Sequence, residues 1–363
     1  MKIGVDARNL VPSLSGIGRY VMEMSRALGA QGHSLVLYLP EAPRTPLPTL
    51  PGCDIRIWNF KGPWRRLIWS QTALPKAANN DRLDLFWGPA HRLPTGLTPR
   101  LPTVVTIHDL VWQKAAETMH WQTWMGERVF MRSALKRADR ILADSDATAK
   151  DIVAFYPDAI GRTHVIHPGL TAFPPPTGRC LVPPNSDGPM RYALFVGTLE
   201  PRKNLVRLLQ AFALIEPTVR SNLKLVIAGG QGWRLNDLSA LIAHLGIQDR
   251  VVLPGYVSDS ELAQLYASAE FLLMPSLYEG FGFPIIEAQS FGVPVITSDR
   301  SSMPEVAGAG AILIDPQDVL AIKNAIISLC SDQTLSKRLS EKGKENAARF
   351  SWQKAAAQLS SII

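Results

Sequence analysis

The stretch from Phe271 to Thr297 constrains the fold more than any other part of the chain, because it reads as a strand, a glycine-rich loop, a helix and a second strand. Gly280 and Gly282 permit backbone conformations that side chains would forbid. Pro284 suits the first turn of a helix, and Gly292 suits its end. The loop is therefore expected at the carboxyl end of a buried strand and before a helix N-terminus, where open α/β sheets bind ligands.

Two glutamates bracket this loop. Glu279 precedes it and can reach a ligand from the loop, whereas Glu287 is expected in the first turn of the following helix. On one straight helix, residues eight apart would point about 80° apart, but the break at 280–284 removes that constraint. The helix dipole alone also favours a glutamate in this place, so a purely structural role for Glu287 stays open.

Strand and helix patterns alternate along the whole chain. We expect strands at 3–7, 34–39, 54–58, 84–87, 102–107, 139–143 and 163–166, and helices near 19–30, 64–78, 121–137 and 145–156. This alternation predicts a mostly parallel sheet with helices on both faces, and the chain is long enough for two such domains. A proline-rich stretch from Pro168 to Pro189 has no helical period and predicts the connector. The predicted domains are residues 1–175 and 176–350.

The positive charge of the chain lies in its first half. Residues 1–180 contain 22 Lys and Arg against 14 Asp and Glu, whereas residues 181–363 contain 16 against 17. A basic half favours an acidic partner, such as a phospholipid surface or a pyrophosphate-linked acceptor. Nucleic acid is not expected, because no helix-turn-helix, zinc-ligand spacing or RNA-binding aromatic signature accompanies the charge.

Tryptophans and cations alternate in the segment WNFKGPWRRLIWSQ. Indole rings and guanidinium groups together suit the headgroup layer of a membrane. The alternative is a partly buried helix with a solvated basic edge. The residues concerned are Trp58, Lys61, Trp64, Arg65, Arg66 and Trp69.

Targeting and metal-binding signals are absent from the sequence. It contains no apolar run of 18 residues and opens directly on a strand pattern, so we expect neither a membrane span nor a signal peptide. Its three cysteines have no metal-site spacing and favour a reducing cytosol, that is, a cytoplasmic location. The Asp-Ser-Asp at 144–146 is expected to cap a helix and not to bind a metal.

Two further loops suit a phosphate group. Arg202 and Lys203 precede a helix expected from Asn204, so two cations and free N–H groups converge, and a diphosphate is the natural occupant. Gly16 and Gly18 follow the first strand and allow the backbone to approach a ligand. The third glycine of a dinucleotide fingerprint is absent, so a nicotinamide cofactor is not expected, and an ordinary turn stays the alternative.

The motif EGFGFPIIEAQSFGVPVITS resembles that of the family 4 retaining glycosyltransferases of the GT-B fold, whose Glu-x7-Glu pair matches Glu279 and Glu287. The resemblance implies two doubly wound Rossmann-like α/β domains facing a central cleft. The first would bind the acceptor and the second a nucleotide sugar. By analogy with this fold, the final helix at 351–363 is expected to pack back on the first domain.

Residue roles follow from the resemblance. Lys203 would stabilise the donor diphosphate together with Arg202, although the family's other cation often directly follows the strand glycine, where this chain has Thr198. His108, after the strand PTVVTIH, would contact the transferred sugar. The catalytic residues implied are Glu279, His108, Lys203 and Arg202. The nucleotide sugar would be bound by Gly16, Gly18, Arg202, Lys203, Val257, Glu279, Gly280, Phe281, Gly282, Phe283 and Glu287.

The activity implied is transfer of a hexose with retention, needing no metal and no cofactor beside the nucleotide sugar. The segments VGTLEPRKN and SLYEGFGFPIIEA look like those of bacterial mannosyltransferases, which favours GDP-mannose over a UDP-sugar. The acceptor expected is a lipid-linked saccharide in the synthesis of cell-surface polysaccharide or lipopolysaccharide, at the inner face of the plasma membrane. Two alternatives stay open: a nucleotide-sugar 2-epimerase, and a catalytically silent nucleotide-sugar-binding protein.

Overall fold

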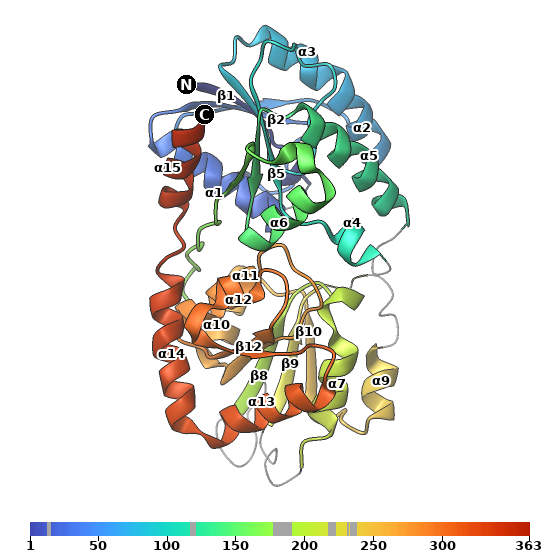
Figure 1. Ribbon diagram of the computed structural model, residues 1–363, viewed down its shortest axis with the longest axis vertical. Helices are drawn as coiled ribbons and strands as arrows, with labels where there is room; N and C mark the ends of the chain where they lie inside the picture. The colour runs from blue at the N-terminus through green and yellow to red at the C-terminus, as the bar shows by residue number, and fades with distance from the viewer. Residues whose placement is uncertain (13–15, 117–120, 177–190, 217–222, 231, 233–237) are drawn as a thin grey trace. The chain divides into compact units, whose positions relative to one another are not determined.

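The computed structural model describes residues 1–12, 16–116, 121–176, 191–216, 223–230, 232 and 238–363 (Figure 1). The chain forms two compact units. Unit 1 comprises Met1–Trp112, Trp121–Gly169 and Ser351–Ile363, and unit 2 comprises Gln113–His120 and Leu170–Phe350. The chain thus passes into unit 2 at Leu170, shortly before the boundary expected at 175/176. The part of the predicted connector that begins at residue 177 lies outside the described residues.

Unit 1 is built on a seven-stranded sheet in the order β3-β2-β1-β4-β5-β6-β7, and all of its strand pairs are parallel. Its strands are β1 (Lys2–Asp6), β2 (Ser34–Leu39), β3 (Cys53–Ile57), β4 (Leu85–Gly88), β5 (Thr103–Ile107), β6 (Arg140–Ala143) and β7 (Thr163–Val165). Its helices are α1 (Gly16–Ala30), α2 (Pro63–Gln71), α3 (Ala73–Asn80), α5 (Trp121–Arg137), α6 (Asp146–Phe155) and α15 (Trp352–Ile362), and the short α4 (Val111–Lys114) bridges the two units in sequence.

Unit 2 has a six-stranded parallel sheet in the order β10-β9-β8-β11-β12-β13. Its strands are β8 (Arg191–Val196), β9 (Leu223–Ala228), β10 (Val251–Gly255), β11 (Phe271–Met274), β12 (Val295–Ser298) and β13 (Ala311–Ile314). Its helices are α7 (Leu205–Ala213), α9 (Leu238–His244), α10 (Asp259–Ser268), α11 (Phe283–Ser290), α12 (Met303–Ala307), α13 (Val319–Ser331) and α14 (Gln333–Ala347).

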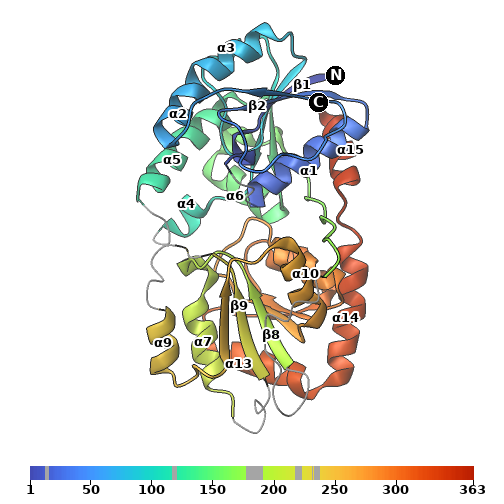
Figure 2. The ribbon, with the colours of Figure 1, turned by 180° about the vertical axis from the view of Figure 1, so that it is seen from behind.

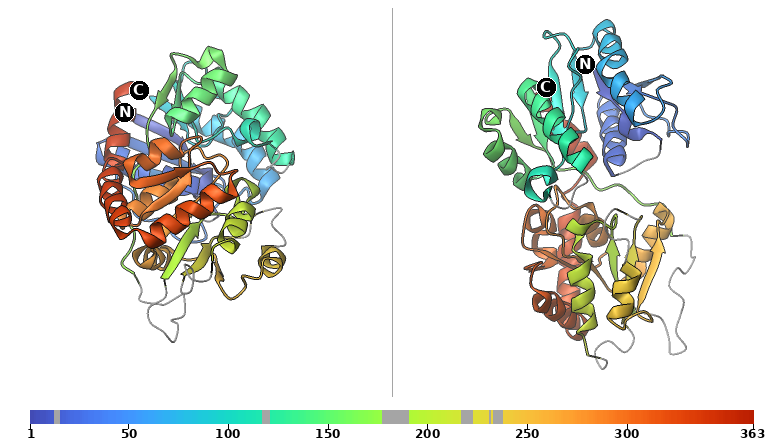
Figure 3. Two further views of the ribbon diagram at one scale, coloured as in Figure 1. Left: turned by 60° about the horizontal axis from the view of Figure 1, so that its bottom comes forward. Right: turned by 90° about the vertical axis from the view of Figure 1, so that its right-hand side faces the viewer.

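Helices cover both faces of the sheet in unit 2 (Figure 3). Successive side chains of a strand point to opposite faces, so Phe195 of β8 packs in the cluster with α7 and α13, and its neighbour Leu194 packs in the cluster with α10, α11 and α12. Both side chains are fully buried. The two predicted doubly wound α/β domains are therefore confirmed.

The strand order of each sheet reverses at one place, between β1 and β4 in unit 1 and between β8 and β11 in unit 2. Ligands of open α/β sheets bind outside the carboxyl ends of the strands at such a reversal. In unit 1 this place receives the segments that follow β1, β4 and β5. In unit 2 it receives the segments that follow β8 and β11, which carry the predicted diphosphate and sugar residues.

The helix predicted over 64–78 is wrong as a single element, because the structure breaks it at Thr72 into α2 and α3. Pro75 explains the break. It has no N–H to donate to the carbonyl of Gln71, and its ring would clash with that carbonyl in a continuous helix. The helix predicted from Arg19 begins earlier, at Gly16, so the two glycines lie in its first turn.

Helix α15 belongs to unit 1, although it follows unit 2 in sequence. It lies beside α1, as Figures 1 and 2 show from opposite sides. Gln31 Nε2 donates to the carbonyl of Gln353 at 3.1 Å, and the Tyr20 and Trp352 rings meet edge to face at 5.6 Å. Ser351 caps the helix by accepting a hydrogen bond from the N–H of Lys354.

Candidate active site

In unit 2, the segments after β8 and β11 meet. The N–H of Leu277, after β11, donates to the carbonyl of Arg202, after β8, at 2.8 Å. Asn204, which precedes α7, holds a left-handed conformation and donates through Nδ2 to the carbonyl of Pro275 at 3.0 Å. These contacts hold the loop after β8, which carries Arg202 and Lys203, against the loop after β11, which carries Glu279 and is called the acidic loop below.

Arg202, Lys203 and Glu279 form one ionic cluster. Lys203 Nζ lies 2.6 Å from Glu279 Oε1, and Arg202 Nη1 lies 2.5 Å from Glu279 Oε2. Lys203 and Glu279 are buried, and Arg202 is partly buried. Each carboxylate oxygen of Glu279 therefore has its own cation. The structure brings together three of the four residues that the sequence predicts to be catalytic.

The cluster perturbs the titration of its members. Burial alone would raise the pKa of Glu279, but Arg202 and Lys203 outweigh it and lower that pKa to about 2. Burial lowers the pKa of Lys203, and the opposing attraction of Glu279 only partly offsets the effect. Glu279 is thus an anion at neutral pH. Its single charge is shared by the two cations that would hold a diphosphate, and Glu200 Oε2 supplies a second carboxylate oxygen 2.9 Å from Arg202 Nε.

The backbone of the acidic loop is held by two serines that the sequence did not single out. Ser302 Oγ donates to the carbonyls of Glu279 at 3.0 Å and of Phe281 at 2.8 Å, and Ser301 Oγ also donates to the carbonyl of Glu279. Ser301 has a φ of 55°. No local signal in the sequence marks these residues, because the contact joins segments more than twenty positions apart.

The other residues of unit 2 that are predicted to bind the nucleotide sugar lie in the loop before α11, in α11 itself and after β10. Gly280, Phe281, Gly282 and Phe283 lead into α11, and Gly282 takes the cap position with a φ of 108°. Phe281 is buried in the core of unit 2, and its contact with a ligand stays a prediction.

The predicted first-turn position of Glu287 is wrong, because α11 begins at Phe283 and Glu287 follows its first turn. Glu287 Oε2 accepts a hydrogen bond from the hydroxyl of Tyr266 at 2.8 Å. Glu287 is buried. Val257 follows β10, is half-buried, and directly precedes Ser258, which forms a capping box with Glu261. Contacts of Glu287 and Val257 with the nucleotide sugar stay predictions.

In unit 1, His108 follows β5 and is buried. Its Nδ1 lies 2.6 Å from Asp144 Oδ2, and its Nε2 lies 2.7 Å from the carbonyl oxygen of Pro89. A carboxylate and a carbonyl are both acceptors, so both ring nitrogens carry hydrogen and the imidazole is a cation. Burial lowers the pKa of His108, but Asp144 and the Pro89 carbonyl outweigh it and raise that pKa above its usual value.

Asp144 shows what sequence reasoning missed in the Asp-Ser-Asp segment. The cap itself is confirmed, because Ser145 Oγ accepts a hydrogen bond from the N–H of Thr148. Asp144, however, pairs with His108 instead of capping the helix. The available signal was positional, since His108 and Asp144 each follow one of two adjacent strands, β5 and β6.

Gly16 and Gly18 lie in the first turn of α1, after β1, where the sequence predicts a close approach to a ligand. A Cβ added at Gly16 would meet no atom of the described residues within 4 Å. The packing of these residues therefore does not require glycine there, and the ligand contact stays a prediction.

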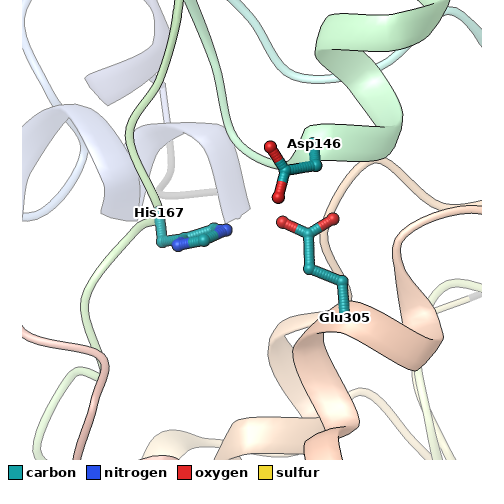
Figure 4. Close-up of side chains that lie close together, drawn as sticks. All are labelled: Asp146, His167 and Glu305. Atoms are coloured by element: carbon teal, nitrogen blue, oxygen red, sulfur yellow. The ribbon is translucent and has the colours of Figure 1, made fainter.

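Three further residues of a type that can bind a metal ion, two carboxylates and one imidazole, lie outside the sites described above. In unit 1, Asp146 lies in the first turn of α6 and His167 in the segment after β7 (Figure 4). In unit 2, Glu305 lies in the first turn of α12 (Figure 4). The prediction that no metal is needed stays a prediction.

The tryptophan and cation stretch is not a uniform membrane face. Trp69 is fully buried, and Trp58 is half-buried with its ring 6.1 Å from that of Trp69. Arg66 pairs with Glu41. These residues therefore fit the alternative stated above, a partly buried helix with a solvated basic edge, because α2 packs one of its sides into the core, and membrane contact stays a prediction. Trp64 is 81% exposed and Ile68 is 55% exposed, and Lys61 and Arg65 are exposed beside them. Among the described residues, no carboxylate pairs with either of these two cations.

Among the described residues, no helix combines the length and the apolar character needed to cross a bilayer.

Two family models match the chain. One, described as Glycosyltransferase Family 4, matches residues 14–172, and the other, described as Glycosyl transferases group 1, matches residues 183–346. The chain is 40% identical over 167 residues to the O-antigen chain mannosyltransferase B of Escherichia coli, a match that covers 46% of this chain and 44% of that protein. It is 28% identical to the MMP alpha-(1->4)-mannosyltransferase of Mycolicibacterium hassiacum over 99% of this chain and 96% of that protein.

Solved structures share the fold over the whole chain. WaaG, a glycosyltransferase involved in lipopolysaccharide biosynthesis, matches with a TM-score of 0.77 and 18% identity, covering 100% of this chain and 99% of that one. Anabaena Alr3699/HepE in complex with UDP-glucose matches with a TM-score of 0.73 and 18% identity, covering 100% of both chains. The two family models between them span most of the sequence, both units have the parallel α/β sheets of these structures, and the chain belongs to the family 4 glycosyltransferases of the GT-B fold.

Proposed function

We propose that this protein transfers mannose from GDP-mannose, with retention of configuration, to a hydroxyl group of a lipid-linked saccharide in the synthesis of cell-surface polysaccharide or lipopolysaccharide. The observation that carries the proposal is the buried cluster of Arg202, Lys203 and Glu279 at the strand-order reversal of unit 2. Two cations and an acidic loop at one sheet edge suit a sugar attached to a diphosphate.

Charge balance explains how a donor would use this cluster. The diphosphate would take over Arg202 and Lys203 and leave Glu279 able to turn toward hydroxyl groups of the sugar. Both cations would then stabilise the negative charge that grows on the diphosphate as its bond to the sugar breaks. They supply this charge without a metal ion, so we expect transfer to persist in EDTA.

The reaction breaks the bond between the anomeric carbon and the diphosphate oxygen, and GDP departs with the bonding electrons. The acceptor hydroxyl forms the new bond from the same face of the sugar, and its proton passes to the departing phosphate. Exclusion of water favours the acceptor over hydrolysis. In this scheme Glu279 positions the sugar and does not attack it.

The choice of donor rests on relatives. Two curated relatives are named mannosyltransferases, and a protein with the same fold binds UDP-glucose. The chain spans less than half of the first of these relatives. The donor can therefore be identified before the acceptor is known, by measuring the rate at which the protein slowly hydrolyses GDP-mannose, GDP-glucose and UDP-glucose. We expect GDP-mannose to be hydrolysed fastest.

Variants connect this activity to the site. Lys203→Ala and Glu279→Ala should each lower turnover by about two to three orders of magnitude, as expected on removal of an electrostatic stabiliser. Glu270→Gln is the matched control, because Glu270 forms an ion pair with the exposed Arg191 and not with any residue of the cluster. Full activity of Lys203→Ala would remove Lys203 from the mechanism.

The same assays separate the alternatives. A 2-epimerase would release a free sugar with inverted configuration at C2, without any acceptor. A silent binding protein would bind the nucleotide sugar and turn over none of it. Transfer of labelled mannose to a lipid-extracted saccharide, with the α-anomeric configuration kept, would support the proposal.

Membrane contact follows from the exposed part of α2. Trp64 and Ile68 are four residues apart and therefore lie on one side of the helix, with Lys61 and Arg65 close in sequence. An indole suits the membrane interface, and the cations suit anionic headgroups. We include in the proposal that this patch holds the protein at the inner face of the plasma membrane, where its acceptor would lie.

Vesicle sedimentation tests this contact. Wild-type protein should sediment with anionic phosphatidylglycerol vesicles at low salt and be released at high salt. Trp64→Ser and Arg65→Glu should weaken binding, while Leu320→Ser and Lys337→Glu, which alter an exposed leucine and a lysine of unit 2, should not. Absence of wild-type binding at low salt would defeat the membrane contact.

A further inference from the structure

We propose that His91 and Glu127 are positioning residues for His108, a role that goes beyond the function proposed above and rests on it for the importance of His108. No motif considered in the sequence analysis includes either residue. All the contacts that carry the inference lie within unit 1.

The short segment after β4 wraps around His108. The carbonyl of Pro89 accepts from His108 Nε2 at 2.7 Å, and His91 Nε2 accepts from the backbone N–H of His108 at 2.9 Å. Gly88 makes this return possible, because a side chain there would collide with the carbonyl of Arg92. His108 is thus contacted by this segment through both its ring and its backbone.

His91 is held in a conformation that few side chains adopt. Its φ is 60°, and its own N–H donates to the carbonyl of Thr106, in β5, at 2.9 Å. Only a few per cent of residues other than glycine occupy this region, although histidine is enriched there together with asparagine and aspartate. The contacts of the ring explain the conformation, because they bring Nε2 to the N–H of His108.

Glu127 selects the form of His91 that can make this bond. Since Nε2 accepts a hydrogen, the ring hydrogen of a neutral His91 lies on Nδ1, and Nδ1 is 3.1 Å from Glu127 Oε2. Arg92 Nη2 lies 3.1 Å from the other oxygen of the same carboxylate. Burial would raise the pKa of Glu127, but His91 and Arg92 outweigh it and lower that pKa to about 2, so the acceptor stays ionised.

The result is a chain of fixed groups that ends on a cation. Glu127 orients His91, His91 holds the backbone of His108, and Asp144 and Pro89 hold its ring. The Tyr20 ring closes another side, edge to face at 4.8 Å and 84°. Loss of the His91 acceptor would leave a buried N–H without its partner and free the segment from 89 to 91 to move away from the imidazole.

Two substitutions of His91 separate positioning from bulk packing. In His91→Gln, the side-chain oxygen reaches the place of Nε2 and can still accept from His108. In His91→Asn, the shorter side chain replaces Nδ1 and leaves no acceptor at the place of Nε2. Asparagine tolerates a positive φ better than glutamine does, so backbone strain alone would favour His91→Asn, opposite to the effect proposed.

Hydrogen exchange of the His108 amide and steady-state kinetics are the two readouts. We expect exchange of this amide to be about tenfold faster in His91→Asn than in the wild type, and close to the wild type in His91→Gln. The reason is that a buried N–H without its acceptor makes local opening more favourable by a factor of about ten or more. We expect kcat to fall about tenfold in His91→Asn, with the KM for the donor within about twofold, and His91→Gln to retain most of it.

A third variant tests Glu127. In Glu127→Ala, nitrogen NMR shifts of the His91 ring should change from a single form protonated on Nδ1 to a mixture of forms, while thermal melts confirm that the protein is folded. Equal kcat values in His91→Asn and His91→Gln, or unchanged exchange of the His108 amide in His91→Asn, would overturn the inference. If the wild type transfers no sugar, the proposed function fails, and the exchange and NMR readouts alone decide the role of His91 and Glu127.

Discussion

Glu279→Gln tests the electrostatics of the cluster most directly. The change keeps the size of the side chain and removes the charge that balances Arg202 and Lys203. The pKa of Glu279 is lowered from 4.5 to about 2, and about 1.4 kcal/mol per pKa unit gives about 3 kcal/mol of stabilisation from the ionised form. This agrees with the cost of about 3 to 5 kcal/mol for removing one partner of a buried ion pair.

Thermal unfolding followed by circular dichroism measures the effect. A loss of about 3 kcal/mol in a unit of this size should lower Tm by about 6 to 12 °C. The control is Glu270→Gln, whose partner Arg191 is exposed, and we expect a loss of at most about 1 kcal/mol there. Inorganic pyrophosphate should raise Tm more in Glu279→Gln than in the wild type, because it supplies the missing negative charge.

Two results would refute this reasoning. If Tm of Glu279→Gln stays within about 2 °C of the wild type, the carboxylate does not balance buried cations as the structure indicates. If pyrophosphate stabilises both proteins equally, the diphosphate and the carboxylate do not share Arg202 and Lys203.

Three further predictions concern stability. Because the folded-state pKa of Glu279 is depressed, its stabilisation is present above about pH 4.5 and is lost as the pH falls toward 2; urea unfolding at pH 5 and pH 3 should show a loss about 2 kcal/mol larger in the wild type than in Glu279→Gln. Tyr266→Phe removes the hydroxyl bound to the buried Glu287 and should cost about 1 to 3 kcal/mol, and an unchanged urea midpoint would contradict the role of this bond. Gly292→Ala should lower Tm because φ is 75° there, whereas Gly230→Ala, which meets nothing within 4 Å, should not; equal melts would argue against backbone strain.

The two sheets and their helix caps could be predicted because they depend on local patterns. The apolar run before Pro275 forms β11, and Gly282 and Gly292 flank α11 as expected. Ser258 starts a capping box that needs only the glutamate three residues later. Such signals involve residues within one turn of each other, so the sequence contains them in full.

The contacts within the site could be predicted only in part. That Arg202, Lys203 and Glu279 belong to one site followed from their places after β8 and β11, since parallel strands bring their carboxyl ends to one edge. That Glu279 pairs with both cations did not follow, because it depends on where Ser302 holds the loop from another segment.

The unit 1 contacts were harder still to predict. His91 binds the backbone of His108 with a positive φ, which is uncommon for any residue other than glycine, and no nearby residue marks that conformation. Burial of Trp69 and exposure of Trp64 likewise depend on how the short α2 is rotated, which nine residues of mixed pattern do not determine.

The membership of α15 in unit 1 affects the order in which the protein can be completed during synthesis. The ribosome synthesises residues 1–169 long before residues 351–363, so α1 cannot pack against α15 until all of unit 2 has been made. Until then, the side of α1 that α15 covers can bind chaperones or form non-native contacts. A fragment ending near residue 175 would stay in that unfinished condition, and supplying the missing helix as a separate peptide should restore its cooperative melting.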